Sequence, residues 1–426
     1  MNGTLRPGVQ QLLFGWVNFA LTAPAIYLWL GLPLIMRQQG WSGTEIGVFQ
    51  LAGLPAVFKA LLAIPVERWL LRRRSALSSD PAFDPSNRVL AWQRWAWLTG
   101  GGFTLCLLAL AAVGEDAGKG TLFALALLAA LLSTWADIPV QALAIGLLPP
   151  QARPLAGGIR AAATFAGAVV GGGLMLLLQQ ARGWALPFLI LAAAVSSALV
   201  IVAVLGRGSA PSPQAMSSGA AVSRLAPWRV WRGFFQQPGA PAWTLLLAGQ
   251  FPFVAAAWVF LKPLLLDHGL PAAQVALVAG VGGGALGAGA SLAAGWVRRE
   301  RLMSMAWLSA WANVLALGLF AAVLGFQLGV EARWGLLAGS AALALAMGLA
   351  SSLAFALMME FSRDACRATD YGLQAGLFAL SRVLVPPVAG LLLDRFGDAA
   401  MLGALAALAL CTALAGRRLR QGASTS

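Results

Sequence analysis

The chain has 426 residues and a formal net charge of +14, and its composition is 59% hydrophobic and only 10% charged. A soluble protein of this length cannot bury so much apolar sequence in its interior, whereas a lipid bilayer can. Composition therefore excludes a soluble globular fold and indicates a membrane protein.

Twelve apolar stretches follow one another, each long enough to cross about 30 Å of hydrocarbon as a helix. No stretch alternates at period two as a transmembrane barrel requires. We therefore predict an all-α membrane protein with 12 transmembrane helices at about 11–36, 43–66, 90–112, 121–148, 154–180, 184–206, 241–266, 271–297, 302–326, 334–359, 371–393 and 397–416.

The basic residues predict the orientation of these helices. With the N-terminus in the cytoplasm, 21 of the 29 Lys and Arg fall on the cytoplasmic side and 6 on the other. By the positive-inside rule, both termini are then predicted to be cytoplasmic. The high Ala, Leu, Gly and Arg content suggests a GC-rich bacterial genome, so we expect a multi-pass protein of the bacterial inner (plasma) membrane. This topology accounts for the basic excess, so no nucleic-acid partner is expected.

The chain contains an internal repeat. Arg153, Gly158 and Ala161 recur as Arg367, Gly372 and Ala375 at an offset of 214 residues. Six predicted helices lie on each side of a Ser-, Ala-, Pro- and Gly-rich segment. We predict an N-terminal six-helix bundle (1–206), a cytoplasmic linker with an interfacial amphipathic helix (207–240), a C-terminal bundle (241–416) and a cytoplasmic tail (417–426). This organisation resembles the major facilitator superfamily, in which the solute binds between the halves.

In the first half, ionisable and aromatic side chains inside predicted helices are candidates for the solute pathway, since a charge near the bilayer centre costs about 2.5–3.5 kcal/mol. Asp137 shares a helical stripe with Ser133 and Gln141 and is expected to face solute or carry a proton; a structural partner is the alternative. Lys59 is expected either to pair with Asp137 or to extend to the interface. Asn18, Trp16 and Trp135 complete the candidates of this half.

In the second half, Gln374, Phe378 and Arg382 recur at four-residue steps and form one predicted face. Arg382 could hold an anionic phenolate or carboxylate, or be neutralised within its own half. Gln250 is a further candidate, with helix–helix hydrogen bonding as the commoner role of such amides.

Charged residues at helix ends are predicted to act in gating or to form the loop motif. Asp370 is expected first as a helix N-cap and second as a partner of Arg367 or Arg363. The remaining members of this group are Glu67, Arg68, Arg72, Arg73, Arg153, Arg160, Glu360 and Arg367.

Three segments resemble a known transporter group. Gly43–Arg68, with Val57-Phe58-Lys59, resembles muropeptide permeases and peptide–acetyl-coenzyme A transporters, and so does Ala136–Gly172. Ala136 and Gln141 depart from the group, which often has Gln and a second Asp there. Ala368–Phe378 (ATDYGLQAGLF) resembles the subgroup that imports ferric siderophores, such as the ferripyochelin and rhizobactin permeases.

The resemblance implies a secondary active importer of a metal–siderophore complex, working by alternating access and coupled to protons through Asp137. Seventeen Trp and 20 Phe against 2 Tyr favour a flat, ring-containing solute. A muropeptide or other amphipathic solute is the alternative, followed by a drug exporter or a membrane enzyme. We predict no enzyme activity, because His268 is the single histidine and no metal, cofactor or catalytic cluster is visible. The expected partners are a small solute and the bilayer, and the expected state is a monomer.

Overall fold

The computed structural model describes residues 6–67, 86–115, 117–205, 227–326 and 332–424. In this part of the chain every regular element is helical, and 11 helices are long and apolar enough to cross a membrane. The last of them, Asp364–Arg417, contains two of the predicted spans, because Gly397 interrupts it with φ 78° and ψ 178°. Each of the 12 predicted stretches thus has a helical counterpart, and the all-α prediction is confirmed.

Packing divides the chain into two compact units. The first contains residues 1–152, 166–234 and 359–376, and the second contains residues 153–165, 235–358 and 377–426. Most of each predicted half stays together in one unit. The start of the fifth predicted span belongs to the second unit, however, and the start of the eleventh belongs to the first.

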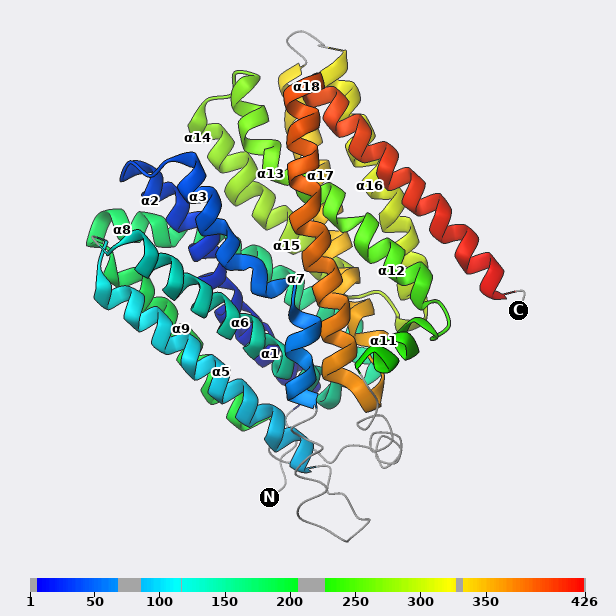
Figure 1. Ribbon diagram of the computed structural model, residues 1–426. Helices are drawn as coiled ribbons and strands as arrows, with labels where there is room; N and C mark the ends of the chain where they lie inside the picture. Colours follow the sequence, from blue (N-terminus) through cyan, green and yellow to red (C-terminus); the bar gives the residue numbers. More distant parts are fainter. Residues whose placement is uncertain (1–5, 68–85, 116, 206–226, 327–331, 425–426) are drawn as a thin grey trace. The chain divides into compact units, whose positions relative to one another are not determined.

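In the first unit, α5 packs between α6 and α9, while α1 packs against α9 (Figure 1). The second span has an irregular middle, because Pro55 lies in a 3-10 segment and a turn at 57–58 precedes helical residues 59–67. The elements are α1 (Pro7–Ile26), η1 (Tyr27–Gly31), α2 (Leu32–Gln38), α3 (Gly43–Gln50), η2 (Leu51–Ala56), α5 (Ser86–Val113), α6 (Lys119–Leu147), η3 (Pro150–Ala152), η4 (Val170–Leu174), α8 (Met175–Arg182) and α9 (Ala185–Leu205), with the parts of α7 (Arg153–Val169), α11 (Pro227–Phe235) and α18 (Arg367–Ser424) that fall in this unit.

In the second unit, the seventh span is broken into two helices at Gln250, whose φ of −119° and ψ of −64° depart from helical values. Pro252 follows at the start of the second piece and has no N–H to continue the helical ladder. The elements of this unit are α12 (Ala240–Gly249), α13 (Phe251–Asp267), α14 (Ala272–Val275), η5 (Ala276–Gly282), α15 (Gly283–Ala294), η6 (Arg299–Arg301), α16 (Leu302–Gly325) and α17 (Ala332–Glu360). The short 3-10 helix η7 (Asp364–Cys366), which follows α17 in the sequence, belongs to the first unit.

Large apolar side chains lie both inside each unit and on its surface. The core of the second unit includes Leu261, Leu317 and Phe320, which are at most 1% exposed. Leu98 and Leu105, by contrast, are 70% and 67% exposed on α5. Exposed leucines in the middle of such long helices are expected where lipid, rather than water, surrounds the protein.

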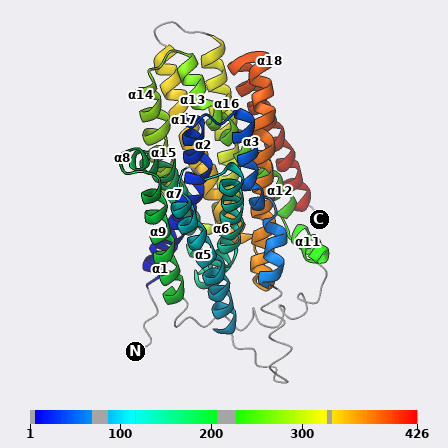
Figure 2. The same cartoon turned by 60° about the vertical axis from the view of Figure 1, so that its left-hand side comes forward.

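The repeated glycines occupy comparable positions in the two units. A Cβ atom on Gly372 would lie 2.6 Å from Ala63 Cβ and 2.9 Å from the carbonyl oxygen of Lys59. A Cβ on Gly158 would lie 2.6 Å from the carbonyl oxygen of Ser291. Each glycine therefore lets its helix approach the backbone of a neighbour, as small residues do in membrane bundles. Figures 1 and 2 both show the start of α18 beside segment 59–67.

Candidate functional site

The first unit contains an ion pair within membrane-spanning sequence. The ammonium of Lys59 binds Oδ2 of Asp137, and the two side chains are only 12% and 15% exposed. This is one of the two arrangements weighed from the sequence for Lys59. Where water is excluded, removal of one member of such an ion pair is strongly destabilising, because the other charge stays buried without a counter-ion.

Three further side chains lie around this pair. The Tyr371 hydroxyl donates to Asp137 Oδ2 over 3.1 Å, and Gln141 Nε2 donates to Asp137 Oδ1 over 3.0 Å. Gln141 also donates to Asn18 Oδ1 over 2.7 Å, and Asn18 donates to the carbonyl of Phe14. Both carboxylate oxygens are therefore hydrogen-bonded, by groups from three separate parts of the chain.

Lys59 has a second contact with Tyr371, because its ammonium lies 5.5 Å from the centroid of the tyrosine ring. A cation over an aromatic face is attracted by the ring quadrupole. The ammonium is thus held both by the carboxylate of Asp137 and by the tyrosine that binds the same carboxylate. We call Lys59, Asp137, Gln141 and Tyr371 the buried polar cluster.

Backbone irregularities accompany the cluster. Pro139 lies inside α6, two residues after Asp137, and cannot donate to the carbonyl of Trp135. On the second span, Lys59 follows the turn after η2. Gly376 lets α18 approach this turn, since a Cβ there would lie 3.0 Å from the Val57 carbonyl oxygen.

The N-terminus of α18 binds a second carboxylate. Glu67 Oε2 accepts from the backbone N–H groups of Ala368 and Thr369, at 3.0 and 3.3 Å. The free N–H groups and the dipole of a helix N-terminus make it a favourable place for an anion. This contact joins the end of the second span to the start of α18.

Arg363 and Asp370 form a buried, two-pronged ion pair at the same end of α18. Arg363 Nε and Nη2 each donate over 2.7 Å to different oxygens of Asp370, whose side chain is 0% exposed. The hydrogen bonds that Arg363 donates to Asp370 raise the pKa of the Arg363 guanidinium. Next to this pair, Arg367 donates to Asp364 and lies near the Trp92 ring.

The N-cap prediction for Asp370 is wrong. Helix α18 begins at Arg367, so Asp370 lies in its first turn and not before it. The short 3-10 turn Asp364–Cys366 directly precedes the helix, which therefore starts at Arg367, four residues before the start at residue 371 that an N-cap at Asp370 would give. Asp370 instead has the partner that was the second expectation, Arg363.

Three predicted pathway residues of the first unit have local hydrogen bonds or packing partners. The Ser133 hydroxyl donates to the Ala130 carbonyl. The Trp16 indole donates to Ser197 on α9, and its side chain is 43% exposed. Trp135 packs against Trp95 with ring centroids 5.3 Å apart. None of these contacts joins the buried polar cluster.

The predicted face of Gln374, Phe378 and Arg382 is divided between the two units. Gln374, in the first unit, donates to the Asp370 carbonyl and to Ser362. Arg382, in the second, lies 5.9 and 5.8 Å from the rings of Phe251 and Phe378. The three residues keep their four-residue spacing on the helical part of α18 before Gly397, and their role as one solute-facing surface stays a prediction.

The remaining residues predicted to act in gating differ in their place on the helices. Arg153 is buried at the start of α7, whereas Arg160 is buried in the middle of that helix, 4.4 Å from the ring of Phe355 in the second unit. Glu360 is half-buried at the end of α17. Arg68, Arg72 and Arg73 lie outside the described residues.

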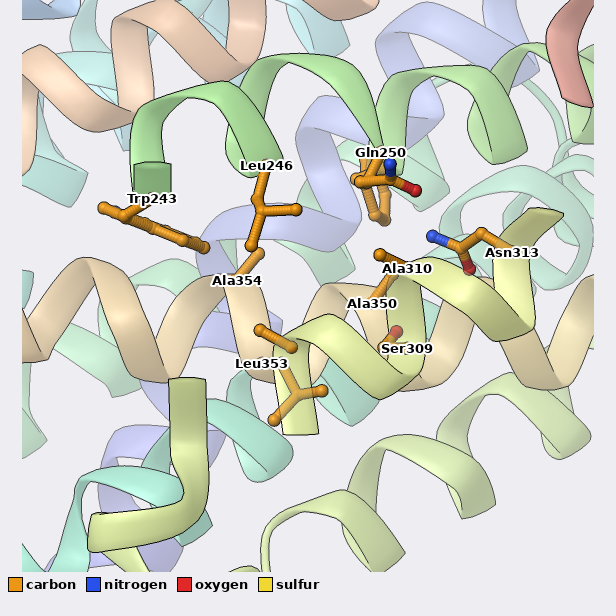
Figure 3. A pocket seen from close by; sticks show the side chains of 11 residues that line it. Trp243, Leu246, Gln250, Ser309, Ala310, Asn313, Ala350, Leu353 and Ala354 are labelled. Atoms are coloured by element: carbon orange, nitrogen blue, oxygen red, sulfur yellow. The ribbon is translucent and has the colours of Figure 1, made fainter. Parts of the chain in front are cut away.

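A small cavity lies between α12, α13, α16 and α17 in the second unit, with a volume of about 30 Å³ (Figure 3). Gln250 Nε2 donates to Ala409 and Thr412, which turns Gln250 Oε1 away from them. In the described part of the chain, Gln250 Oε1, Ser309 Oγ and both amide atoms of Asn313 have no hydrogen-bond partner. The space suits one or two water molecules bound by these polar groups.

Sequence reasoning did not nominate Tyr371 or Ser309. Tyr371 is one of only two tyrosines and lies within the Ala368–Phe378 segment that carried the resemblance, so its position was a usable signal. Ser309 is one small polar residue in an apolar helix, and its sequence context gave no signal of a functional position. No group of three or more His, Cys, Asp or Glu that could hold a metal ion occurs among the residues that the structure describes.

Comparison with known proteins places this geometry in a family. The Major Facilitator Superfamily profile matches residues 12–373. Among solved structures, a bacterial homologue of the iron transporter ferroportin in an outward-facing state is 18% identical, with a TM-score of 0.67 and coverage of 99% of this chain and 100% of that one.

The transporter FucP in its outward conformation is 17% identical, with a TM-score of 0.65 and coverage of 97% of this chain and 98% of that one. The human organic anion transporter MFSD10 is 14% identical, with a TM-score of 0.65 and coverage of 96% and 99%. At these identities the likeness shows the fold. The family match, which covers most of the chain, establishes that the chain belongs to the Major Facilitator Superfamily and is a multi-pass membrane transporter.

Proposed function

We propose that the protein is a secondary active importer in which protonation of Asp137 is coupled to movement of the solute. The observation that carries this proposal is the buried ion pair of Lys59 and Asp137, with Tyr371 bound to the same carboxylate. A transporter retains an ion pair in membrane-spanning sequence at a considerable energetic cost, and such pairs commonly mark proton or solute pathways.

The coupling follows from the charges of the cluster. A proton on Asp137 removes the negative charge that balances Lys59, and the two hydrogen bonds to the carboxylate weaken because they are strongest with a charged acceptor. Tyr371 is part of α18, whereas Lys59 and Asp137 belong to the second and fourth spans. Protonation therefore loosens the attachment of α18 to these spans, which is the kind of two-state contact that a proton gradient can drive.

For the solute, we propose a ferric siderophore of the phenolate type. The support is the resemblance of Ala368–Phe378 to siderophore importers, and this segment contributes Tyr371 to the buried polar cluster. Arg382 supports the same class, since its guanidinium lies beside two aromatic rings that pack against each other, Phe251 and Phe378, and a guanidinium next to aromatic rings suits a flat anionic ligand. A muropeptide or another amphipathic solute is the second candidate, supported by the resemblance of Gly43–Arg68.

Uptake of iron-55-labelled phenolate siderophores tests both parts of the proposal. Cells lacking their own inner-membrane importer would carry the wild type, Asp137→Asn, or Glu45→Gln as a matched control. Glu45 is a suitable control because it precedes the membrane-spanning stretch Val48–Glu67 of the structure, where its carboxylate forms the Ser42 capping box and a solvent-exposed ion pair with Lys119. Membrane levels of each variant would be measured in parallel.

We expect uptake by the wild type and Glu45→Gln that an uncoupler abolishes, and loss of uptake by Asp137→Asn at equal protein level. Uptake that survives the uncoupler would contradict proton coupling and indicate facilitated diffusion. If the protein raises the uptake of no siderophore in a panel, the proposed solute class is contradicted. Labelled muropeptides would then be tested next.

A further inference from the structure

Helix α11 (Pro227–Phe235) has two opposite faces. Val230 is 8% exposed and Phe234 is 0% exposed, so both are buried. Trp228, Arg232 and Phe235 are exposed, and at 3.6 residues per turn they fall within about 60° of one another, on the side away from Val230 and Phe234.

The exposed face combines aromatic and cationic groups. Arg229 flanks it, with its guanidinium 5.2 Å from the centroid of the Trp228 ring. No Asp or Glu occurs in the sequence between Asp137 and Asp267, so the surrounding segment supplies no acid to neutralise these arginines. In the part of the chain that the structure describes, no ion pair includes Arg229 or Arg232. Their charge is available to an external anion.

The position of α11 in the sequence brings this face to the membrane surface. Only residues 236–239 separate α11 from α12, which begins a membrane-spanning stretch at Ala240. Four residues reach at most about 14 Å. Helix α11 therefore lies within the thickness of the headgroup region, where Trp rings sit at the interface and Arg binds phosphate.

We propose that the exposed face of α11, formed by Trp228, Arg229, Arg232 and Phe235, binds the headgroups of acidic phospholipids at the bilayer surface. The two guanidinium groups meet the lipid phosphates, and the two aromatic rings enter the boundary between headgroups and acyl chains. The absence of acidic residues along this part of the sequence favours an acidic bilayer surface over a basic or neutral partner.

The opposite face of the same helix contacts the ion pair at the start of α18. Arg363 Nη2 donates to the Val230 carbonyl over 2.9 Å, and a Cβ on Gly233 would lie 2.7 Å from Arg363 Nη1. The same guanidinium binds Asp370 through two hydrogen bonds. Figure 1 shows α11 beside the start of α18. Lipid that binds the exposed face of α11 therefore stabilises the helix whose opposite face contacts Arg363. Through this contact, the lipid composition of the membrane affects the stability of the ion pair at the start of α18.

Hydrogen exchange of the full-length protein in lipid nanodiscs tests this proposal. Amide exchange across 227–235 would be compared in phosphatidylcholine alone and with added phosphatidylglycerol, for the wild type and for Arg229→Gln/Arg232→Gln. The matched control is Arg298→Gln/Arg301→Gln, which removes the same charge from exposed positions outside α11. A charge-preserving Arg229→Lys/Arg232→Lys variant separates loss of charge from loss of folding.

We expect phosphatidylglycerol to slow exchange in α11 of the wild type, the control and the lysine variant. In the glutamine variant, the ratio of exchange rates without and with phosphatidylglycerol should fall by roughly fivefold for each arginine removed. Each basic residue near an acidic bilayer surface strengthens binding by about that factor. Equal protection in the glutamine variant would overturn the proposal, and so would identical exchange in both lipids. Protection by soluble glycerophosphoglycerol in phosphatidylcholine discs would show recognition of a free phosphate and would also overturn it.

Discussion

Tyr371 donates its hydroxyl to Oδ2 of Asp137 over 3.1 Å, although 234 residues separate the two in the sequence. Its ring also lies 5.5 Å from the Lys59 ammonium, which binds the same carboxylate oxygen. One side chain of α18 therefore contacts both members of the ion pair. The protonation state of Asp137 and the position of α18 are linked through this contact.

Tyr371→Phe removes only the hydroxyl and should lower the free energy of unfolding by about 1.5–3 kcal/mol, the usual contribution of a hydrogen bond to a charged group. In Asp137→Asn the acceptor is neutral, so Tyr371→Phe should cost less in that background. Thermal unfolding of the two single variants and the double variant in one detergent gives this difference. Strictly additive effects would contradict a direct interaction between the two side chains.

Lys59→Met should destabilise the protein by about 3–5 kcal/mol, because Asp137 would keep a buried charge without its cation. In Lys59→Met/Asp137→Asn neither charge remains, and the single amide oxygen of the asparagine can still accept from one of the two donors, Tyr371 or Gln141, which bind different oxygens of Asp137. We expect the double variant to recover most of the unfolding temperature while uptake stays abolished. A double variant as unstable as Lys59→Met would indicate that packing of the lysine chain, not charge balance, holds the site together.

The sequence predicted the membrane spans because hydropathy acts locally, so each apolar stretch became a helix. It also indicated Asp137 and Gln141, since a four-residue step places both on one side of a helix and they do form a hydrogen bond. Lys59 was harder, because its partner is 78 residues away and depends on how two spans pack. The pairing was foreseen as one of two arrangements.

Contacts of α18 with distant backbone were not predictable from local patterns. The Gln374, Phe378 and Arg382 stripe is regular in sequence, yet the helix leaves one unit and enters the other between Gly376 and Leu377. Asp370 has the residue type and position of an N-cap, but a preceding 3-10 turn starts the helix earlier. In both cases tertiary packing, which no single-sequence pattern encodes, decided the environment of the side chain.

Arg363→Lys should destabilise the protein even though the charge is kept. A lysine is a single point donor and cannot reproduce the two parallel hydrogen bonds to Asp370 together with the one to the Val230 carbonyl. We expect a loss of about 1.5–3 kcal/mol from the missing charged hydrogen bond, and a larger loss for Arg363→Ala, which leaves Asp370 buried and unbalanced. Unfolding temperatures of both variants, with the exposed Arg298→Lys as control, measure this order, and equal temperatures for all three would contradict it.

Gly372→Ala should separate α18 from segment 59–67. The new Cβ would lie 2.6 Å from Ala63 Cβ and 2.9 Å from the Lys59 carbonyl oxygen, and neither atom is the flexible end of a side chain. One of the two helices must move, at a typical cost of about 1–3 kcal/mol for an overpacked site.

Gly403→Ala is the matched control for this substitution, because Gly403 is also helical, in the part of α18 that follows the break at Gly397, and a Cβ there meets nothing within 4 Å. Alanine has the better helix propensity, so Gly403→Ala should raise the free energy of unfolding by about 0.5–1 kcal/mol. The two substitutions are chemically identical, and their opposite signs would come only from the contact that Gly372 makes. A stabilising Gly372→Ala would show that α18 does not need to approach Lys59 so closely, and would weaken the link between the helix and the ion pair.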